Sequence, residues 1–524
     1  MSDLFTCKTI RAIEQRALPL LPEGTLMSRA ANAIADQAEL MLRDAGMIRD
    51  DQNPEQGSEQ SSGQSSGQVL ILAGPGNNGA DALLSGLVLA ERGYRIGVLA
   101  PTLKPGTGKP VAQLNRDILN QYEHQQLPIG QYADILQALR RSRLVIDGLL
   151  GLGQSRPLEA DLHALVNQIN SHRIPVLSVD VPTGLDASTG SILGGNTGIC
   201  LRATRTITLL RNKPGLHTGA GKEHAGLVIL NRLGCHDSAS ADGELFDAGL
   251  AEALLPRRAL NSHKGSFGSV LIMGGAQGMQ GAALLAATGA QAGGAGKVFI
   301  SSPNQPIFVA DQAQWMSRDW PPTMKDIDAT AIGCGLGKSE AARLALNLCL
   351  QSDIPVVLDA DALNMLAEGD ADRGRFERRT TTVMTPHPLE AARLLGCSTA
   401  EIQADRCAMA LQLAREFSSV VILKGAGSVI ASPDGLWSIN GTGTPTLAVA
   451  GTGDVLAGLT AALLAQGMSA WNAARLAAFS HGRAGELMQH HLPAGSGLVA
   501  AELLDPIRRV LNGCELVPDQ APGC

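Results

Sequence analysis

The chain has 524 residues, 44% of them apolar, and a formal net charge of −7 with a pI of about 5.9. The length suggests more than one domain, and the apolar content excludes an intrinsically disordered protein. The slightly acidic balance excludes the basic surface that nucleic-acid-binding proteins present.

The nine cysteines are scattered and form no C-x-x-C pair, which is typical of a reducing compartment and speaks against a zinc ribbon. The first residues lack the basic and apolar regions of a signal peptide. No apolar run reaches the ~18 residues that a membrane span needs. We therefore expect a cytoplasmic protein that binds neither membrane nor nucleic acid.

The first half of the chain alternates short strands with helices. One or two amphipathic helices are expected at the N-terminus, followed by a Ser-, Gln- and Gly-rich segment, Arg49–Gln68, that is typical of a flexible loop. Strands are expected at Val69–Ala73, Arg95–Ala100, Leu144–Ile146 and Val176–Val179. This alternation predicts a parallel sheet with helices on both faces.

Polar residues follow several of these strands. In GPGNNGADAL, glycines permit a sharp turn after the first strand, although a loose G-x-G-x-x-G is a weak sign of a dinucleotide loop without an acidic residue after the next strand. Asp147 and Asp180 end later strands, so both are expected in the crevice at the carboxyl edge of the sheet. Each aspartate could cap the next helix or turn. With the loop asparagines and the Thr183 hydroxyl, they are also ligands that a hard cation prefers.

After Gly226–Leu230 the pattern fades, and a second α/β series follows a linker-like segment, Gly234–Asp247. In VIASPDGLWSI, a Pro-Asp-Gly turn between two β-rich runs predicts a hairpin. The chain therefore reads as two consecutive α/β domains. Strands of the second are expected at Ser269–Met273, Lys297–Ile300, Val356–Leu358, Thr382–Met384 and Val420–Leu423.

The stretch LAVAGTGDVLAGL places Asp454 at the start of an apolar helix, Val455–Ala465. The small residues Gly451, Thr452 and Gly453 would let backbone N–H groups and the helix dipole hold a terminal phosphate. Asp454 would then stand beside an attacking hydroxyl and could accept its proton. An ordinary helix N-cap explains the same local pattern.

Six ordered stretches of the second domain closely resemble the ADP/ATP-dependent NAD(P)H-hydrate dehydratases, which belong to the ribokinase-like superfamily. The resemblance covers about residues 256–510 and rests on HKGSFGSVLIMGGAQGMQGAALLAA, IGCGLGKS, VLDADALNML, TPHPLEAARLLG, VILKGAGSVIASPDG and AGTGDVLAG. It implies a ribokinase-like three-layer sandwich over residues 256–515. The implied activity uses ADP or ATP, with Mg2+, to phosphorylate the C6 hydroxyl of hydrated NADH or NADPH in its S epimer, with loss of phosphate to follow.

The same resemblance implies site residues in this domain. Asp454 would be the base at the C6 hydroxyl and Gly453 would line the nucleotide phosphates. The nucleotide would be contacted by Lys424, Gly425, Ala426, Gly427 and Ser428, and the hydrated nicotinamide by Ala282, Gly335 and His387.

The first domain is similar to the NAD(P)H-hydrate epimerases, the YjeF N-terminal family, over about residues 8–232. The likeness rests on GPGNNGADAL, VIDGLLGLGQSRP, VDVPTGLDASTG and TLLRNKPGLHTGAG. It implies a Rossmann-like three-layer sandwich over residues 1–232, with a linker at 233–255, that interconverts the C6 epimers of hydrated NADH and NADPH and binds K+.

The epimerase resemblance implies a second set of site residues. K+ would be held by Asn78, Asp147 and Thr183. The substrate pocket would be lined by Asn77, Asn78, Gly79, Ala80, Asp81, Gly151, Leu152, Gly153, Gln154, Ser155, Arg156, Pro157 and Asp180. Asp180 is also the candidate acid/base group.

Some residues depart from the family patterns. Ala80 and Ala82 stand where the epimerases usually have glycine, and a methyl group at Ala80 would clash if its φ had to be positive. Cys334 stands where the dehydratases often have proline, and Ala450 precedes Gly451 where many have Gly-Gly.

An epimerase beside a stereospecific dehydratase makes chemical sense, because it recovers the epimer that the dehydratase cannot use. The expected partners are small molecules only, hydrated NADH or NADPH and an adenine nucleotide, and a homo-oligomer is expected. One alternative is a ribokinase-like small-molecule kinase that releases a stable phosphate ester, with a non-catalytic YjeF-like binding domain. Another is a purely structural first domain beside an active second one.

Overall fold

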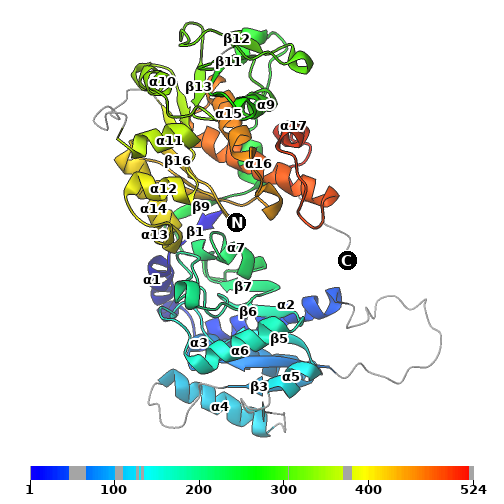
Figure 1. The fold of residues 1–524 in the computed structure, drawn as a ribbon. Helices are drawn as coiled ribbons and strands as arrows, with labels where there is room; N and C mark the ends of the chain where they lie inside the picture. Colours follow the sequence, from blue (N-terminus) through cyan, green and yellow to red (C-terminus); the bar gives the residue numbers. More distant parts are fainter. Residues whose placement is uncertain are drawn as a thin grey trace, which may run out of the picture. The chain divides into compact units, whose positions relative to one another are not determined.

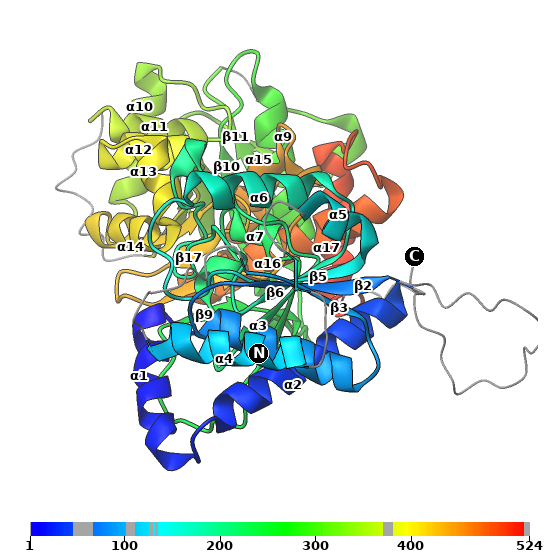
Figure 2. The ribbon, with the colours of Figure 1, turned by 90° about the horizontal axis from the view of Figure 1, so that it is seen from below.

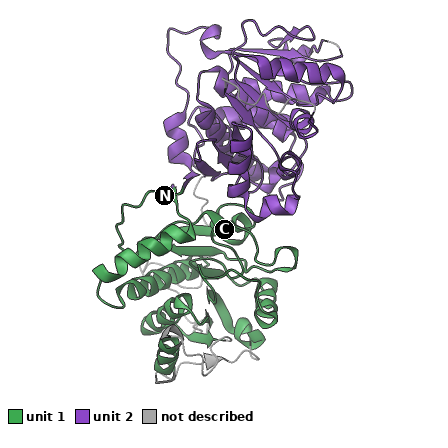
Figure 3. Cartoon of the chain, turned by 90° about the vertical axis from the view of Figure 1, so that its left-hand side faces the viewer, with its two compact units in different colours: residues 1, 3–242, 522–524 green, residues 2, 243–521 purple. Residues whose placement is uncertain are grey.

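The computed structural model describes residues 2–45, 67–100, 110–124, 129–130, 135–304, 306–369 and 381–517. Apart from a few residues at the chain ends, one compact unit comprises Asp3–Asp242 and the other Gly243–Ala521 (Figure 3). Residues 49–66 of the predicted flexible loop lie outside the described residues. None of the described helices is long and apolar enough to cross a membrane.

The first unit is built on a parallel sheet with strand order β4-β3-β2-β5-β6-β7-β8. The chain runs outward from β2 through β3 to β4 and then returns to place β5 beside β2. This reversal leaves a crevice at the carboxyl ends of β2 and β5, where ligands bind in open sheets. The strands are β2 (Gln68–Ala73), β3 (Ile96–Leu99), β4 (Ile129–Gly130), β5 (Ser142–Gly148), β6 (Val176–Val179), β7 (Arg205–Leu209) and β8 (Leu227–Asn231).

Helices cover both faces of this sheet, as predicted. Figure 2 shows α1 to α4 on one side and α5 and α6 on the other. Alternate residues of β2 divide between the two cores: Val69, Ile71 and Ala73 pack with α2 and α3, and Leu70 and Leu72 pack with α5 and α6. A strand buried on both faces therefore reads as a continuous apolar run. The helices are α1 (Cys7–Ala17), α2 (Thr25–Asp44), α3 (Asn77–Glu91), α4 (Pro110–His124), α5 (Ile135–Arg141) and α6 (Ala160–Ser171).

The second unit contains a sheet in the order β9-β18-β17-β16-β15-β14-β13-β10-β11-β12. Its central strands are parallel, whereas β17 pairs antiparallel with β16 and β18 and forms the predicted hairpin. The chain reverses again between β10 and β13. The strands are β9 (Gly243–Phe246), β10 (Ser269–Met273), β11 (Lys297–Ser301), β12 (Met316–Arg318), β13 (Ala329–Ile332), β14 (Val356–Leu358), β15 (Thr382–Met384), β16 (Val420–Leu423), β17 (Val429–Ala431) and β18 (Trp437–Asn440).

Two groups of helices flank the second sheet (Figure 1). The group α9, α15, α16 and α17 shares one apolar core with the strands, and α10 to α14 lie on the other side. The helices are α8 (Ala248–Leu254), α9 (Gln280–Ala292), α10 (Glu340–Gln351), α11 (Ala360–Ala367), α12 (Pro388–Leu395), α13 (Thr399–Ala404), α14 (Arg406–Glu416), α15 (Thr452–Ala465), α16 (Ala470–His491) and α17 (Leu504–Leu511).

The segment 233–255, for which the sequence predicts a linker, contains both β9 and α8. β9 pairs with β18, and the Asp247 side chain caps α8 by accepting a hydrogen bond from the Leu250 backbone at 3.2 Å. The last 13 residues of the segment therefore lie in the second unit, which begins at Gly243. Phe246 and Ala251 are their main apolar contribution to its core, and so few apolar positions give a weak signal in sequence.

Candidate active sites

In the first unit, the turn after β2 is held tightly by glycines. A Cβ at Gly79 would lie 2.0 Å from the Gly74 carbonyl oxygen, and one at Gly74 would lie 1.7 Å from the Leu149 oxygen. These two positions therefore exclude any side chain. The Asn115 amide donates to the Gly74 carbonyl at 2.9 Å and fixes the turn from α4. As a result, Asn77 and Asn78 begin α3 at the reversal between β2 and β5.

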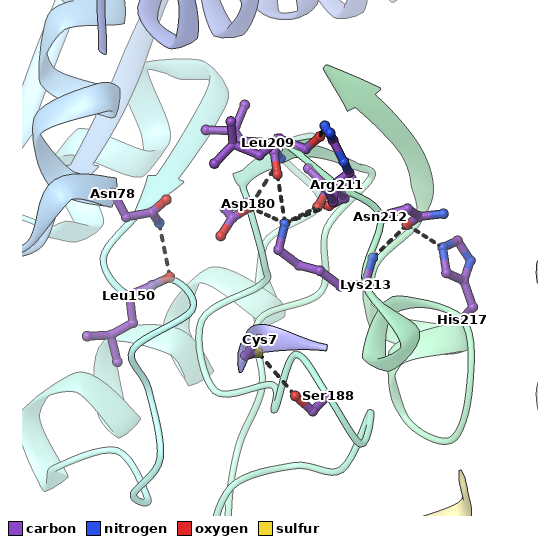
Figure 4. Close-up of polar contacts among 12 residues, drawn as sticks. Cys7, Asn78, Leu150, Asp180, Ser188, Leu209, Arg211, Asn212, Lys213 and His217 are labelled. Atoms are coloured by element: carbon purple, nitrogen blue, oxygen red, sulfur yellow. Dashed lines mark hydrogen bonds and ion pairs between the residues drawn. The ribbon is translucent and has the colours of Figure 1, made fainter. Parts of the chain in front are cut away.

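Asp147 is fully buried at the end of β5 and accepts hydrogen bonds at both carboxylate oxygens. The Thr183 hydroxyl donates at 2.7 Å and the Ser178 hydroxyl at 2.9 Å, with further donation from the backbone of Thr183 and Leu149. Burial raises the pKa of Asp147, and these hydrogen bonds oppose it. No cationic side chain pairs with this carboxyl within the described ranges. Asn78 lies nearby, and its amide nitrogen donates to the Leu150 carbonyl at 3.0 Å (Figure 4).

Asp180 follows β6 with a φ of 67°, in the left-handed region that non-glycine residues rarely adopt. Its Oδ1 lies 2.6 Å from the Nζ of Lys213, which is fully buried, and it accepts a hydrogen bond from the Leu209 backbone at 3.1 Å. Figure 4 shows the lysine amino group reaching from the loop after β7 to this carboxylate. Lys213 lies within one of the stretches that carry the epimerase resemblance, TLLRNKPGLHTGAG, but was not predicted as a site residue.

A cavity of about 1540 Å³ opens beside these residues. Of the predicted pocket residues, it is lined by Asn77, Asn78, Asp81, all seven residues from Gly151 to Pro157, and Asp180. Gly79 and Ala80 lie buried within α3 and are not among the lining residues. Arg11 and Glu14 of α1 also line the cavity. Neither was predicted, because an amphipathic helix outside the motifs carries no local sign of a ligand.

In the second unit, Asp454 lies in the first turn of α15. Gly451 is the N-cap residue directly before this helix, and its φ of 93° lies in the left-handed region that favours glycine. Among the residues that the structure describes, no side chain caps this helix start, so its first N–H groups are available to an anion. Asp454 itself therefore does not serve as the N-cap.

Asp454 shares its surroundings with Cys334 and Asp359. The Cys334 sulfur and one carboxylate oxygen from each aspartate all lie within 4.8 Å of one another. Burial raises the pKa of Asp454 to about 6, with a further contribution from the charge of Asp359, while a hydrogen bond from Cys334 and the charge of Lys424 lower it. Asp359 was not predicted as a site residue, although it directly follows β14 as Asp180 follows β6.

Lys424 connects this group to the predicted nucleotide turn. Its Nζ lies 2.8 Å from Asp359 Oδ1, and the same oxygen accepts from the Thr385 hydroxyl at 2.7 Å. A Cβ added to Gly453 would lie 3.4 Å from this Nζ. Burial alone would lower the pKa of Lys424, but the charges of Asp359 and Glu390 raise it. A fixed cation therefore stands beside the start of α15.

The predicted turn from Gly425 to Ser428 is closed by its own hydrogen bonds. The Ser428 hydroxyl accepts from the Gly425 backbone at 3.2 Å and donates to the Gly425 carbonyl at 3.0 Å. Gly425 and Gly427 both have positive φ, and Ala426 lies between them. The buried Arg406 donates to the Lys424 carbonyl at 3.1 Å and holds the turn from behind.

Among the predicted nicotinamide-pocket residues, Gly335 and Ala282 lie side by side, because a Cβ at Gly335 would stand 3.0 Å from the Ala282 methyl. His387 is the N-cap of α12: its Nδ1 accepts from the backbone of Leu389 at 3.1 Å, and its Nε2 lies 3.2 Å from Glu390. This capping role is the ordinary structural explanation of the histidine.

A buried histidine near Asp454 escaped the sequence analysis. The side chain of His481 in α16 forms a hydrogen bond with the backbone of Thr452, and burial lowers the pKa of His481 to about 4. It lies in the middle of a long helix, where nothing in the local sequence distinguishes it from a packing residue.

Comparisons with known proteins divide the chain in the same way. Residues 270–509 match the family model described as NAD(P)H-hydrate dehydratase, and residues 23–215 match the model described as YjeF-related protein N-terminus. Each matched range lies inside one of the two compact units.

Whole proteins also match. The chain is 34% identical to the bifunctional NAD(P)H-hydrate repair enzyme Nnr of Coxiella burnetii, over 85% of this chain and 90% of that protein. It is 35% identical to the Nnr enzyme of Escherichia coli, over 84% of this chain and 85% of that protein. A crystal structure of ADP/ATP-dependent NAD(P)H-hydrate dehydratase from Bacillus subtilis, co-crystallized with ATP/Mg2+, is 33% identical and covers 52% of this chain and 98% of that one, with a TM-score of 0.45.

Proposed function

The chain belongs to the bifunctional NAD(P)H-hydrate repair enzymes, and from this membership and the two sites we propose how its residues carry out the repair. The enzyme epimerises hydrated NADH or NADPH and dehydrates it back to the intact cofactor. The second unit matches the dehydratase model, and the first unit matches the YjeF-related model.

In the second unit, we assign the base to Asp454. Its carboxylate takes the proton of the C6 hydroxyl as this oxygen attacks the terminal phosphoryl group of ADP or ATP, supplied as the Mg2+ complex. The N–H groups at the start of α15, around Gly453, hold the developing phosphate charge. Lys424 supplies a fixed cation 2.8 Å from Asp359. Phosphate then leaves from C6 and a proton leaves from C5, which restores the dihydropyridine ring.

The other predicted residues complete this site. The turn Lys424, Gly425, Ala426, Gly427 and Ser428 contacts the adenine nucleotide, and Ala282, Gly335 and His387 line the hydrated nicotinamide. The observation that carries the dehydratase assignment is the uncapped start of α15, with Asp454 in its first turn and Lys424 beside it.

In the first unit, we assign acid/base catalysis at C6 to Asp180. The cavity beside Asp180 receives the substrate. Asn77 to Asp81, Gly151 to Pro157 and Asp180 form the substrate pocket. K+ fits the polar group at the end of β5, because Asp147 is a buried carboxyl without a cationic partner in the described part of the chain, and burial alone raises its pKa. The oxygen atoms that would hold the ion belong to Asn78, Asp147 and Thr183. Its positive charge would hold together the chain segments after β2 and β6, which carry Asn78 and Thr183.

A kinase that releases a stable phosphate ester, the alternative reading, does not need the first unit. The relatives that match over both halves are repair enzymes, and the first unit keeps both Asp180 and Asn78 in a cavity. These observations favour two active sites over a kinase with a binding domain.

The assignment is tested with a mixed-epimer preparation of hydrated NADH, with and without ADP or ATP. We expect NADH absorbance to return only with nucleotide, and both epimers to be consumed.

Asp454→Asn should lower this recovery on the order of 10²–10⁴-fold while epimer exchange continues, because a positioned base contributes about that much. Asp180→Asn should leave one epimer unconsumed beyond its slow spontaneous exchange. Recovery at the wild-type rate in Asp454→Asn would refute the base.

A further inference from the structure

Two of the acidic residues that line the first-unit cavity, Asp81 and Asp180, lie in different electrostatic settings. Asp180 is ion-paired with the buried Lys213 at 2.6 Å and also accepts a backbone hydrogen bond. Asp81, on the first turns of α3, lines the same cavity. Within the described ranges, its carboxyl forms neither a hydrogen bond nor an ion pair.

The charges around Asp81 are mainly negative. Burial raises the pKa of Asp81 well above its ordinary value, and the charges of Asp180 and Glu14 raise it further. The pKa of Glu14 in α1 is also raised, mainly by burial and further by the charge of Asp180. The charges of Arg11 and Lys213 oppose this increase. The Cys7 thiol, also near Asp180 and Lys213, has its pKa raised by burial. Asp81 is therefore set to keep its proton while Asp180 is held beside a cation.

The amino group of Lys213 is fixed in place by several oxygen atoms. Its Nζ also donates to the Thr208 hydroxyl at 2.7 Å. It donates as well to the Leu209 carbonyl at 3.0 Å and the Arg211 carbonyl at 3.1 Å (Figure 4). The three N–H donors are thus shared among four oxygen atoms, which fixes the amino group opposite Asp180. The same contact steadies Asp180 in its left-handed backbone conformation.

Exchange of configuration at C6 needs both an acid and a base. C6 carries the hydroxyl and is bonded to the ring nitrogen, so the hydroxyl can leave as water while the nitrogen lone pair forms a C=N bond. Loss of hydroxide is slow unless the oxygen is protonated, and water adding to the opposite face must lose a proton. Two carboxyl groups whose environments separate their pKa values are the usual solution to such a need.

We infer that Asp81 is the proton donor of the epimerase site, and that Lys213 is a positioning residue that gives Asp180 the complementary role of proton acceptor. The inference rests on the epimerase function proposed above. Asp81 gives its proton to the C6 hydroxyl, the C6–O bond breaks, and water leaves with the bonding electrons. A water molecule then attacks C6 from the other face and gives its proton to Asp180. One proton has moved from Asp81 to Asp180, and the reverse reaction or exchange with solvent resets the pair.

The test measures exchange between the two epimers of hydrated NADH without nucleotide, so that dehydration does not compete. Asp81→Asn should lower kcat for exchange by about 10²-fold or more, with KM changed only a few-fold, because a proton donor is lost rather than a binding contact. Wild-type exchange should decline as pH rises through the raised pKa of Asp81, since only the protonated form donates, and Asp81→Asn should lack this decline. Asp117→Asn, an exposed carboxyl on α4 away from the cavity, is the matched control and should behave as wild type.

Lys213 is tested separately by Lys213→Met and Lys213→Arg. We expect the methionine variant to lose most exchange and the arginine variant to recover part of it, because a cation beside Asp180 is restored. Far-UV circular dichroism and the thermal unfolding of each variant report whether the first unit, which contains Lys213, is folded. If Asp81→Asn keeps the wild-type kcat and pH profile, or if Glu14→Gln removes the high-pH decline instead, the inference is wrong. A wild-type protein that exchanges no epimers counts against the proposed function itself.

Discussion

The thiol of Cys334 occupies a chemically sensitive position. It is buried and forms a hydrogen bond with Asp454, the proposed base, at a position where the resemblance leads one to expect proline. Burial and the negative charge of Asp454 raise the pKa of this thiol well above its ordinary value, so it remains a neutral donor. The substitution has therefore placed a hydrogen-bond donor against the carboxylate rather than merely altering a turn.

Removal of this donor should be visible in the pH dependence of dehydration. The Asp454 carboxyl, with a pKa of about 6, acts as a base only when ionised, so NADH recovery should fall as pH drops through about 6. In Cys334→Ala the pKa of Asp454 rises, and the fall should begin at higher pH, with activity at pH 6 reduced about twofold to tenfold. Cys349→Ala, a buried cysteine of α10, is the control and should leave the pH profile in place. An unchanged profile in Cys334→Ala would show that the thiol does not tune the base.

The alanines of the first-unit turn are accommodated without strain. Ala80 and Ala82 lie inside α3, and neither has a positive φ. The clash that a methyl group would cause at a positive φ therefore does not occur. The Ala82 methyl instead occupies the space beside Gly148, where an added Cβ would come within 2.4 Å. Glycine at position 148 thus makes room for alanine at 82. In the second unit, likewise, the left-handed residue is Gly451, and Ala450 needs no positive φ.

At the level of elements, small residues let α9 and α15 pack closely. A Cβ at Gly289 would lie 2.0 Å from the Val455 carbonyl oxygen, and one at Gly458 would lie 1.7 Å from the Ala286 oxygen. The backbones of the two helices therefore meet at these glycines. Because Asp454 stands in the first turn of α15 and Ala282 near the start of α9, this crossing sets the position of both residues relative to the sheet.

Gly458→Ala should accordingly destabilise the second unit. The added methyl group meets backbone rather than a flexible side chain, so the helices must separate, and we expect a loss of about 1–3 kcal/mol or more in the free energy of unfolding. Urea denaturation measures this loss. Gly281→Ala in α9 is the matched control, because its added Cβ has no atom within 4 Å, and it should be neutral or slightly stabilising through its helix propensity. Equal stability of the two variants would contradict close helix packing as the reason for Gly458.

At the level of the whole molecule, each unit carries its own sheet, its own reversal of chain direction and its own site. Asp180 and Lys213 belong to the first unit, and Asp454, Asp359 and Lys424 belong to the second. Neither proposed site needs a residue from the other unit. The two activities should therefore be separable.

This separability predicts complementation between two defective proteins. Asp180→Asn retains the dehydratase site and Asp454→Asn retains the epimerase site, so a mixture of the two with ADP should consume both epimers and return NADH. Each variant alone should fail at one of these steps. NADH recovery from mixed-epimer substrate measures the result. The control is the double variant Asp180→Asn/Asp454→Asn, mixed with either single variant at the same protein concentration. A mixture no better than its parts would mean that the sites depend on each other within one chain.

The sequence by itself determined the fold class, the two α/β halves and the elements with strong local patterns. Strands Val176–Val179, Ser269–Met273, Val356–Leu358, Thr382–Met384 and Val420–Leu423 are confirmed with the same bounds, because buried parallel strands are short β-branched runs. The Pro-Asp-Gly hairpin is confirmed for a similar local reason. The segment β9 to α8 was instead interpreted as a linker, because its place beside β18 depends on a strand nearly 200 residues later.

Only the tertiary structure decided which charges meet. Lys213 beside Asp180, Lys424 beside Asp359 and Cys334 beside Asp454 join residues separated by tens to more than a hundred positions, and no local pattern encodes such pairs. Burial, which raises the pKa of Asp81 and Asp454, is likewise a property of the folded chain. Local sequence fixes strands and turns through short-range sterics, whereas the protonation of a site follows from the distant groups that the fold places around it.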